Sequence, residues 1–420
     1  MIDVLLDEGS FSEIGRDGGF GTIEGRPVCV YNLKGVFNGC DEKVAELALK
    51  TGSPLVVVVN VERFEIDFES LKGLSKLSQA LSLASGVIPR IGVFLSDIHW
   101  MFAQLPLDFK IGLKGKMFSL VLPEIIESMS KERATGMEDM AKGGIVHLVA
   151  ESDEECIEIT RRLFGYLPLN NMEDPPIAET SDDPARKLEF KPEGIYDVRD
   201  LVRDVMDDGD FFELMPDFAP NAVVGFGRLD GTTVGVVGNN PFFQFGCLDV
   251  NSARKISWFV RFCDAFNVPV VSFVDTPGFI PSNDQERGGL AREISELFKM
   301  FSEVTSSLIT VVIGKAYGVA GMVMGSKLTG ADVVYAYPNA EFAVTDLDTD
   351  VKRIYGELGE EERRKKVEEY RKTEASAERA LERGFVDAII EPEWTRSRII
   401  NALRMLETKR RRLPPKKHDT

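Results

Sequence analysis

The residues with the clearest chemical potential in this sequence lie in Lys315–Gly321, KAYGVAG. The apolar run Leu308–Ile313 before it predicts a buried strand, and the small residues after it predict a helix. Backbone N–H groups at a helix start can bind a negative charge, and small side chains let a ligand approach them. Gly318, Val319 and Ala320 are therefore candidates for an anion hole. The alternative is that the small residues only allow close helix–sheet packing.

The elements that would position this segment belong to a pattern that occurs twice in the chain. Each copy predicts a hairpin with an acidic-Gly turn, followed by strands buried on both faces. Three pairs of segments align in the same order: Phe20–Val30 with Phe226–Val236, Ser53–Val61 with Val268–Thr276, and Ile88–Asp97 with Ser307–Ala316. Duplication of one α/β unit explains this repeat, and the alternative is chance similarity between buried strands.

A segment rich in proline and acidic residues divides the two copies. Tyr166–Gly194 contains five prolines, and a packed element does not form at that density of proline and charge. We therefore expect a domain at residues 1–165, a linker at 166–194 and a second domain at 195–420.

Composition limits the classes of function. The 420-residue chain has a formal net charge of −18, which disfavours nucleic-acid binding by the whole surface. Five scattered cysteines and three isolated histidines predict neither a disulfide framework nor a zinc site. No apolar run reaches the roughly 18 residues of a membrane span. The acidic start does not resemble a signal peptide, so we expect a cytoplasmic protein.

Several longer stretches carry a family resemblance. Among them are DVLLDEGSF, VMDDGDFFE, SARKISWFVRFCDAFNVPVVSFVDTPGFIPSNDQERGG, KAYGVAGMVMGSK and ERGFVDAIIEP. With these, the chain resembles the carboxyltransferase (β-type) subunits of biotin-dependent acyl-CoA carboxylases, such as propionyl-CoA carboxylase. It is similar also to the α subunits of biotin-dependent acyl-CoA decarboxylases.

The resemblance implies an α/β fold of two crotonase-type ββα superhelix domains. It implies that acyl-CoA lies mainly on the first domain and carboxybiotin mainly on the second, with no metal on this chain. Carboxyl would move between the biotin and the α-carbon of the thioester, and backbone N–H pairs would stabilise the anions formed. The implied partners are a biotin carboxyl carrier protein, a biotin carboxylase and further copies of the chain, usually in a hexamer.

The family's motifs suggest roles for particular residues. Gly318, Val319 and Ala320 stand where the family usually has Gly-Gly-Ala, so Val319 replaces a glycine and would restrict approach or forbid a positive φ. The candidates beside carboxybiotin are Pro277, Gly278, Phe279, Gln285, Gly288 and Gly289, some of which would shape the loop rather than touch biotin.

The first half departs from the family. Trp100, Met101 and Phe102 stand opposite 318–320 in the repeat, where the family has its small-residue thioester hole. In the second half, Asp346–Asp350, DLDTD, replaces a small-residue segment. It lacks the glycine and distal glutamate of a calcium loop, so we expect a polar loop.

Three hypotheses follow from these departures. The chain is a divergent carboxyltransferase component, a non-catalytic paralogue with a structural or regulatory role, or a crotonase-type enzyme of another reaction on CoA thioesters. The third needs an acid–base group at the hole, and Glu62 and Asp97 are the candidates.

Overall fold

The computed structural model describes residues 2–35, 40–61 and 67–415, and the chain divides into two compact units. The first comprises residues up to Pro176 with Met215–Phe218, and the second comprises Ile177–Leu214 and residues from Ala219 onward. All of residues 166–194 are described, and none of them lies in a helix or strand. Leu167 and Leu188 within this segment are nevertheless buried. Leu167 belongs to the first unit and Leu188 to the second, because the boundary lies at 176/177.

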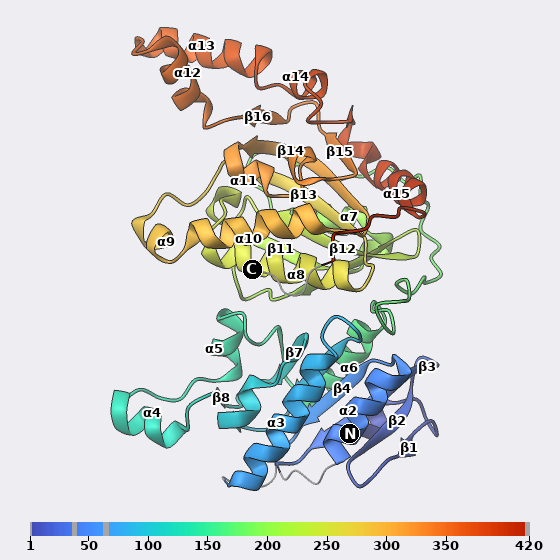
Figure 1. Cartoon of the computed structure of the whole chain (residues 1–420). Helices are drawn as coiled ribbons and strands as arrows, with labels where there is room; N and C mark the ends of the chain where they lie inside the picture. Colours follow the sequence, from blue (N-terminus) through green and yellow to red (C-terminus); the bar gives the residue numbers. More distant parts are fainter. Residues whose placement is uncertain (1, 36–39, 62–66, 416–420) are drawn as a thin grey trace. The chain divides into compact units, whose positions relative to one another are not determined.

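The first unit is built on a mixed sheet (Figure 1) in the order β1-β2-β3-β4-β5-β7-β9, beside a short parallel pair, β6-β8. The strands are β1 (Ser12–Glu13), β2 (Gly18–Ile23), β3 (Arg26–Leu33), β4 (Leu55–Val59), β5 (Arg90–Phe94), β6 (Ile98–His99), β7 (Phe109–Leu113), β8 (Phe118–Ser119) and β9 (Leu148–Ala150). The helices are α1 (Ile2–Leu5), α2 (Cys40–Thr51), α3 (Phe68–Leu83), the 3₁₀ helix η1 (Trp100–Gln104), α4 (Pro123–Ser130), α5 (Met137–Lys142) and α6 (Asp153–Phe164). From β3 onward the strands of the main sheet run parallel, joined by crossovers that contain helices.

The second unit has the sheet order β10-β11-β12-β13-β14-β15-β17, with β16 on β14. Its strands are β10 (Phe211–Leu214), β11 (Ala222–Leu229), β12 (Thr232–Asn239), β13 (Val270–Thr276), β14 (Leu308–Tyr317), β15 (Val333–Ala336), β16 (Glu341–Ala343) and β17 (Ala388–Ile389). Its α-helices are α7 (Val198–Val205), α8 (Val250–Ala265), α9 (Asn283–Arg287), α10 (Leu290–Glu303), α11 (Gly318–Met322), α12 (Leu347–Tyr355), α13 (Glu360–Thr373), α14 (Ala377–Glu382) and α15 (Thr395–Leu406), and its 3₁₀ helices are η2 (Asp207–Gly209), η3 (Gln244–Gly246), η4 (Lys327–Thr329) and η5 (Pro392–Trp394). In Figure 1, α8 and α10 lie side by side over the sheet.

The two sheets repeat one another in register, as the aligned segments predict. In the first unit Cys29 pairs with Leu55 and Leu55 with Arg90; in the second, Gly235 pairs with Val270 and Val270 with Leu308. These residues are the aligned partners, because Cys29 corresponds to Gly235 and Leu55 to Val270. The internal duplication is therefore visible in the strand pairing.

In both units an aspartate accepts hydrogen bonds from the backbone N–H groups of the hairpin turn. Asp7 accepts hydrogen bonds from the N–H groups of Glu24 (3.0 Å) and Gly25 (2.8 Å), and it pairs with Arg161 of α6 at 3.0 Å. The hydrogen bond from the Gly25 N–H above all holds the pKa of Asp7 well below its usual range, although burial opposes ionisation.

In the second unit Asp207 takes the place of Asp7. Its carboxylate accepts from the N–H groups of Asp230 (3.0 Å) and Gly231 (2.8 Å), and Arg396 of α15 lies 2.6 Å away. Arg396 is fully buried, so the aspartate–arginine pair of the second unit is more buried than that of the first.

Candidate functional site

The candidate anion hole lies where β14 ends and α11 begins. Tyr317 is the N-cap of α11, and its side chain makes no capping hydrogen bond. The first N–H groups of a helix have no partner within the helix, and this applies to those at the start of α11. Ala320 is 1% exposed, whereas Val319 is 47% exposed.

The backbone of the turn resolves the question raised by Val319. Gly318 has φ +56°, in the left-handed region that favours glycine, and Val319 is not among the positive-φ residues of the described chain. A Cβ on Gly318 would also lie 2.8 Å from the carbonyl oxygen of Val344. The special conformation therefore falls on the glycine that is retained, and the backbone tolerates valine next to it.

Asp275 ties this turn to the neighbouring strand. It lies at an irregularity in the β13–β14 pairing, between Val274 and Thr276. Its Oδ1 accepts a hydrogen bond from the Lys315 N–H at 2.8 Å, and its Oδ2 accepts one from the Tyr196 hydroxyl at 2.9 Å. Burial raises the pKa of Asp275 against these hydrogen bonds.

The sequence analysis did not single out Asp275 or Tyr196. The available signal was an acidic residue at the end of an otherwise apolar strand, VVSFVDT, since such a charge needs partners when buried.

A second hydrogen-bonded chain lies on the other side of the turn. The Tyr317 hydroxyl donates to Glu341 of β16, and Arg371 of α13 donates to the other oxygen of Glu341 at 2.8 Å. Burial, followed by the bond to Glu341, raises the pKa of Tyr317. The residue before Gly318 is therefore held by its side chain as well as by the sheet.

The candidate biotin-side residues separate into two groups. Pro277, Gly278 and Phe279 follow β13 directly, and β13 ends beside the turn because Thr276 pairs with Ala316. Gly278 accepts a hydrogen bond from the Leu248 N–H at 3.0 Å, which fixes the course of this loop.

The second group makes contacts within the unit. Gln285 of α9 accepts a hydrogen bond from the Val250 N–H at 2.9 Å, so its carboxamide oxygen binds the first N–H group of α8. Gly288 ends α9, and Gly289, with φ +95°, begins α10. These three residues therefore lie at the junction between α9, α10 and the start of α8.

In the first unit, η1 occupies the position equivalent to α11. Its residues Trp100, Met101 and Phe102 contain no glycine; the side chains of the first two lie outside the described part of the structure, and Phe102 is buried. Asp97 accepts a hydrogen bond from the Met117 N–H at 2.9 Å, which is a structural role, and Glu62 lies outside the described residues. Of the two acid–base candidates, the structure therefore describes only Asp97, and it shows that carboxylate bound to a backbone N–H.

The prediction of a polar loop at Asp346–Asp350 is wrong. Asp346 is the N-cap of α12 and accepts from the Thr349 N–H at 3.0 Å, while Asp350 is buried within the helix. The alternating carboxylates begin a helix, because Asp346 accepts a hydrogen bond from one of the free N–H groups in the first turn of α12. Among the described residues, no three His, Cys, Asp or Glu side chains are grouped to hold a metal ion.

Comparison with known proteins agrees with this architecture. Residues 14–420 match the model of the carboxyl transferase domain. The chain belongs to the carboxyl transferase domain family.

The named relatives cover nearly the whole chain. A propionyl-CoA carboxylase carboxyltransferase subunit of Haloferax mediterranei is 36% identical over 99% of this chain and 91% of its own length. A methylmalonyl-CoA decarboxylase subunit alpha of Veillonella parvula is 37% identical over 95% of this chain and 84% of its own. The predicted function, that of a carboxyltransferase of the biotin-dependent acyl-CoA carboxylases and decarboxylases, is confirmed.

Among solved structures, a crystal structure of transcarboxylase 12S aligns with a TM-score of 0.95 and 34% identity, covering 100% of this carboxyltransferase and 91% of that chain. That structure is of a hexamer with hydrolysed methylmalonyl-coenzyme A bound. The crotonase-like fold expected from the resemblance is confirmed. Within the described ranges, no helix of the carboxyltransferase is long and apolar enough to cross a membrane.

Proposed function

We propose that this carboxyltransferase moves a carboxyl group between carboxybiotin and the α-carbon of a short-chain acyl-CoA, with an anion hole at Gly318, Val319 and Ala320. The observation that carries the proposal is the meeting of two strand ends. Thr276 pairs with Ala316, so the loop from Pro277 and the turn at Gly318 emerge from adjacent parallel strands at the same edge of the sheet. Ligands of open α/β sheets bind at this edge.

The backbone at Gly318–Ala320 suits the biotin ring, which is neutral when bound to carrier and becomes negatively charged when carboxybiotin loses its carboxyl group. Gly318, with its positive φ, is the first residue of α11, and the N–H groups of Val319 and Ala320 follow it. Donors held in place in advance stabilise developing charge at little reorganisation cost. Carboxybiotin would supply the activated carboxyl group and, after losing it, a nitrogen that accepts the substrate proton. The chain's own contribution is then to hold a carbonyl oxygen against the N–H groups of Val319 and Ala320.

Several further residues position this arrangement. Asp275 holds the Lys315 N–H, and Glu341 holds the Tyr317 hydroxyl, so both sides of the turn are fixed before ligand arrives. Pro277, Gly278 and Phe279 form the wall toward the biotin, while Gln285, Gly288 and Gly289 keep that wall in place from α9 and α10. In this proposal the domains at 1–165 and 195–420 take acyl-CoA and carboxybiotin respectively.

The partners follow from the same chemistry. Biotin would arrive on a biotin carboxyl carrier protein, be carboxylated by a separate biotin carboxylase, and meet a carboxyltransferase that assembles as a hexamer in the cytoplasm.

The test is carboxyl transfer by the purified chain with free biotin as acceptor. Methylmalonyl-CoA or malonyl-CoA is the donor, and loss of the carboxylated thioester is followed with a known carboxyltransferase in parallel. Biotin-dependent turnover supports the proposal. A folded chain that gives none, with the parallel enzyme active, refutes it for the isolated chain.

One observation favours a second candidate, a non-catalytic subunit of such a complex. The first unit presents Phe102, buried, and no glycine in η1, where its repeat partner α11 has Gly318 and Gly321. Under this alternative the chain stays inert alone and raises transfer only when mixed with a catalytic carboxyltransferase.

A further inference from the structure

The connection between β15 and β17 is much longer than two adjacent parallel strands require. A crossover of about a dozen residues would be enough. β15 ends at Ala336 and β17 begins at Ala388, and β16, α12, α13 and α14 lie between them. We call this segment, residues 341–382, the arm. Within it α12 and α13 lie side by side (Figure 1), and α13 has no buried residue. Its half-buried residues, Val367 and Tyr370, pack against a small cluster that contains Tyr317.

The arm contacts both residues at the junction of β14 and α11. β16 pairs with the end of β14 as far as Tyr317. The carbonyl oxygen of Val344, just after β16, lies 2.8 Å from the position of a Cβ on Gly318. The next residue, Thr345, donates from its hydroxyl to Oδ1 of the buried Asp350 at 2.8 Å. Asp350 of α12 therefore holds the backbone that packs against Gly318.

A charged link from α13 reaches the same junction. Nε of Arg371 donates to Oε1 of Glu341 at 2.8 Å, and Oε2 of Glu341 accepts from the Tyr317 hydroxyl. The Glu341 side chain is 19% exposed and Tyr317 is 5% exposed, so water competes little for these bonds. Arg371 also donates from Nη1 to Glu368 of its own helix at 2.6 Å, which orients the guanidinium. Through Glu341, Arg371 thus binds the residue that precedes Gly318.

The internal repeat gives the arm a counterpart in the first unit. Ile98 pairs with Phe118 there as Ala316 pairs with Phe342 in the second unit. Helices follow each of these strand pairs, α4 and α5 in the first unit and α12 to α14 in the second. β8 is therefore the equivalent of β16, and the two arms can be compared residue by residue at this point.

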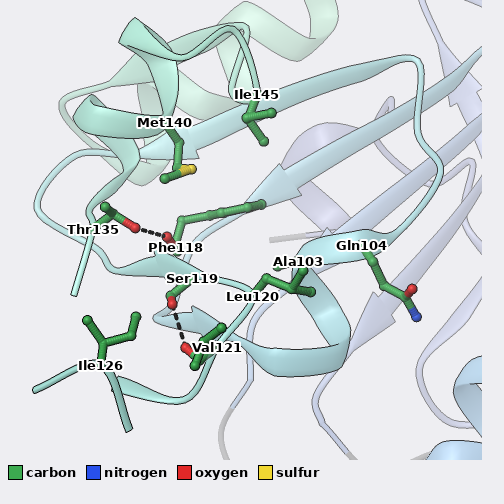
Figure 2. Close-up of a pocket in the computed structure, with 10 residues that line it drawn as sticks. All are labelled: Ala103, Gln104, Phe118, Ser119, Leu120, Val121, Ile126, Thr135, Met140 and Ile145. Carbon is green, nitrogen blue, oxygen red and sulfur yellow. Dashed lines mark hydrogen bonds between the residues drawn. The ribbon is translucent and has the colours of Figure 1, made fainter. Parts of the chain in front are cut away.

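The counterpart is built without the charged link. Met117, the residue before Phe118, stands in the place of Glu341, and each of the two bridges to the N-cap of the last helix of its own arm. A methionine carries no carboxylate. Beside β8, η1 and α4 the first unit has a cavity of about 360 Å³ (Figure 2), and none of the ten residues that line it is ionisable. The repeated fold thus forms without a charged pair here, and the pair occurs in the unit that carries the proposed anion hole.

We propose that Arg371 is a positioning residue for carboxyl transfer, which acts through Glu341 and Tyr317 on the anion hole at the start of α11. The arm then sets the orientation of the turn at Gly318, and detaching α13 from the turn lowers the rate of transfer. The inference rests on the proposed function for the location of the hole. All of these contacts lie within one chain, so they do not depend on how subunits are arranged.

The experiment measures kcat and KM for transfer from methylmalonyl-CoA to free biotin by the full chain. Arg371→Met removes the donor from a side chain that is 43% exposed, so the fold should tolerate it. It should lower kcat about tenfold and leave both KM values within about twofold of wild type, because a misplaced hole stabilises the transition state less. Arg371→Lys keeps a positively charged donor and should recover most of the lost kcat. Unchanged kcat in Arg371→Met overturns the proposal.

Lys372→Met is the matched control. Lys372 is the next residue of α13, and among the described residues its ion-pair partner is Glu368, at 3.1 Å, and not Glu341. It therefore shares one partner with Arg371 and lacks the one that leads to Tyr317. Lys372→Met should keep wild-type kcat. A loss equal to that of Arg371→Met would show a general effect of charge on α13 and would overturn the assignment.

Tyr317→Phe tests the route and decides the case in which Arg371→Met fails to fold. It removes only the hydroxyl and keeps the ring in its cluster, and it should lower kcat as Arg371→Met does. In the double variant the two losses should not multiply, because both substitutions break the same link. Multiplied losses, or wild-type kcat in Tyr317→Phe, refute the route through Tyr317.

Hydrogen–deuterium exchange at residues 318–322 separates this inference from the proposed function. Faster exchange there in Arg371→Met than in Lys372→Met supports the link whether or not the chain transfers carboxyl groups, and equal exchange overturns it. Biotin-dependent turnover with equal kcat in the two variants would keep the proposed function and remove this inference. No turnover in wild type, with faster exchange in Arg371→Met, would remove the proposed function and keep the link between α13 and the turn.

Discussion

At the scale of single residues, Gly318 is required by the backbone conformation of the turn and also belongs to the proposed anion hole. Its positive φ and the carbonyl of Val344 both exclude a side chain. Gly318→Ala should therefore lower the free energy of unfolding by about 1–3 kcal/mol and reduce carboxyl transfer further than the loss of folded protein explains. Denaturant unfolding and the transfer assay on the same preparation measure both effects.

Gly384→Ala is the matched control. Gly384 has φ +77° but open space around its Cβ position, so alanine there meets backbone strain without a clash. It should lower stability by about 1–2 kcal/mol and leave specific transfer activity unchanged. Full activity in Gly318→Ala would show that the turn does not form the site.

Asp275 gives a prediction in pH. Burial raises its pKa in the folded chain above the ordinary value of 3.8, so its contribution to stability is fully present below pH 3.8 and is lost as pH rises through the raised value. Asp275→Asn removes this titration and keeps an acceptor for the Lys315 N–H. The stability of wild type relative to the variant should fall as pH rises from 3.8, measured by urea unfolding across pH. A constant difference would contradict the assigned burial effect.

At the scale of elements, the aspartate that holds the hairpin turn occurs in both units, and its substitution should lower the free energy of unfolding by different amounts in the two. Asp7→Asn weakens hydrogen bonds to a partly exposed turn and should cost about 1 kcal/mol. Asp207→Asn removes the nearer of two carboxylates from the fully buried Arg396, which keeps Asp182 at 3.5 Å, and should cost more, on the order of 2–3 kcal/mol. Chemical denaturation of the two variants compares them directly, and equal costs would contradict the difference in burial.

The sequence predicted elements best where both copies carried the same signal. The hairpins and apolar strands recur in order, and the structure pairs their aligned residues. The prediction at Asp346–Asp350 failed because an aspartate favours helix N-caps and loops alike, and Asp346 is an N-cap here.

Side-chain roles in the site were less predictable for a related reason. Gln285 reaches the start of α8 from another segment of the chain, and the Asp275–Tyr196 bond joins residues 79 positions apart. No local spacing encodes such contacts. The sequence also does not show which residue of the turn has a positive φ; the structure places it at Gly318 and not at Val319.

At the scale of the whole molecule, the proposal of a hexamer predicts a mass in solution. Analytical ultracentrifugation should give a species of six times the 46.7 kDa chain mass. Exposed apolar side chains such as Met129 on α4 and Val344 after β16 would be covered in such an assembly. A monomer at micromolar concentration would contradict the proposed assembly.

The most direct test of the central claim is transfer from methylmalonyl-CoA to free biotin by two tryptophan variants. Val319 and Leu328 are both about half exposed in the same unit, at 47% and 56%, so tryptophan at either should leave the fold intact. Val319→Trp covers the proposed anion hole and is expected to lower kcat about 100-fold or more, whereas Leu328→Trp should keep wild-type turnover. Equal turnover in the two variants would contradict an anion hole at the start of α11.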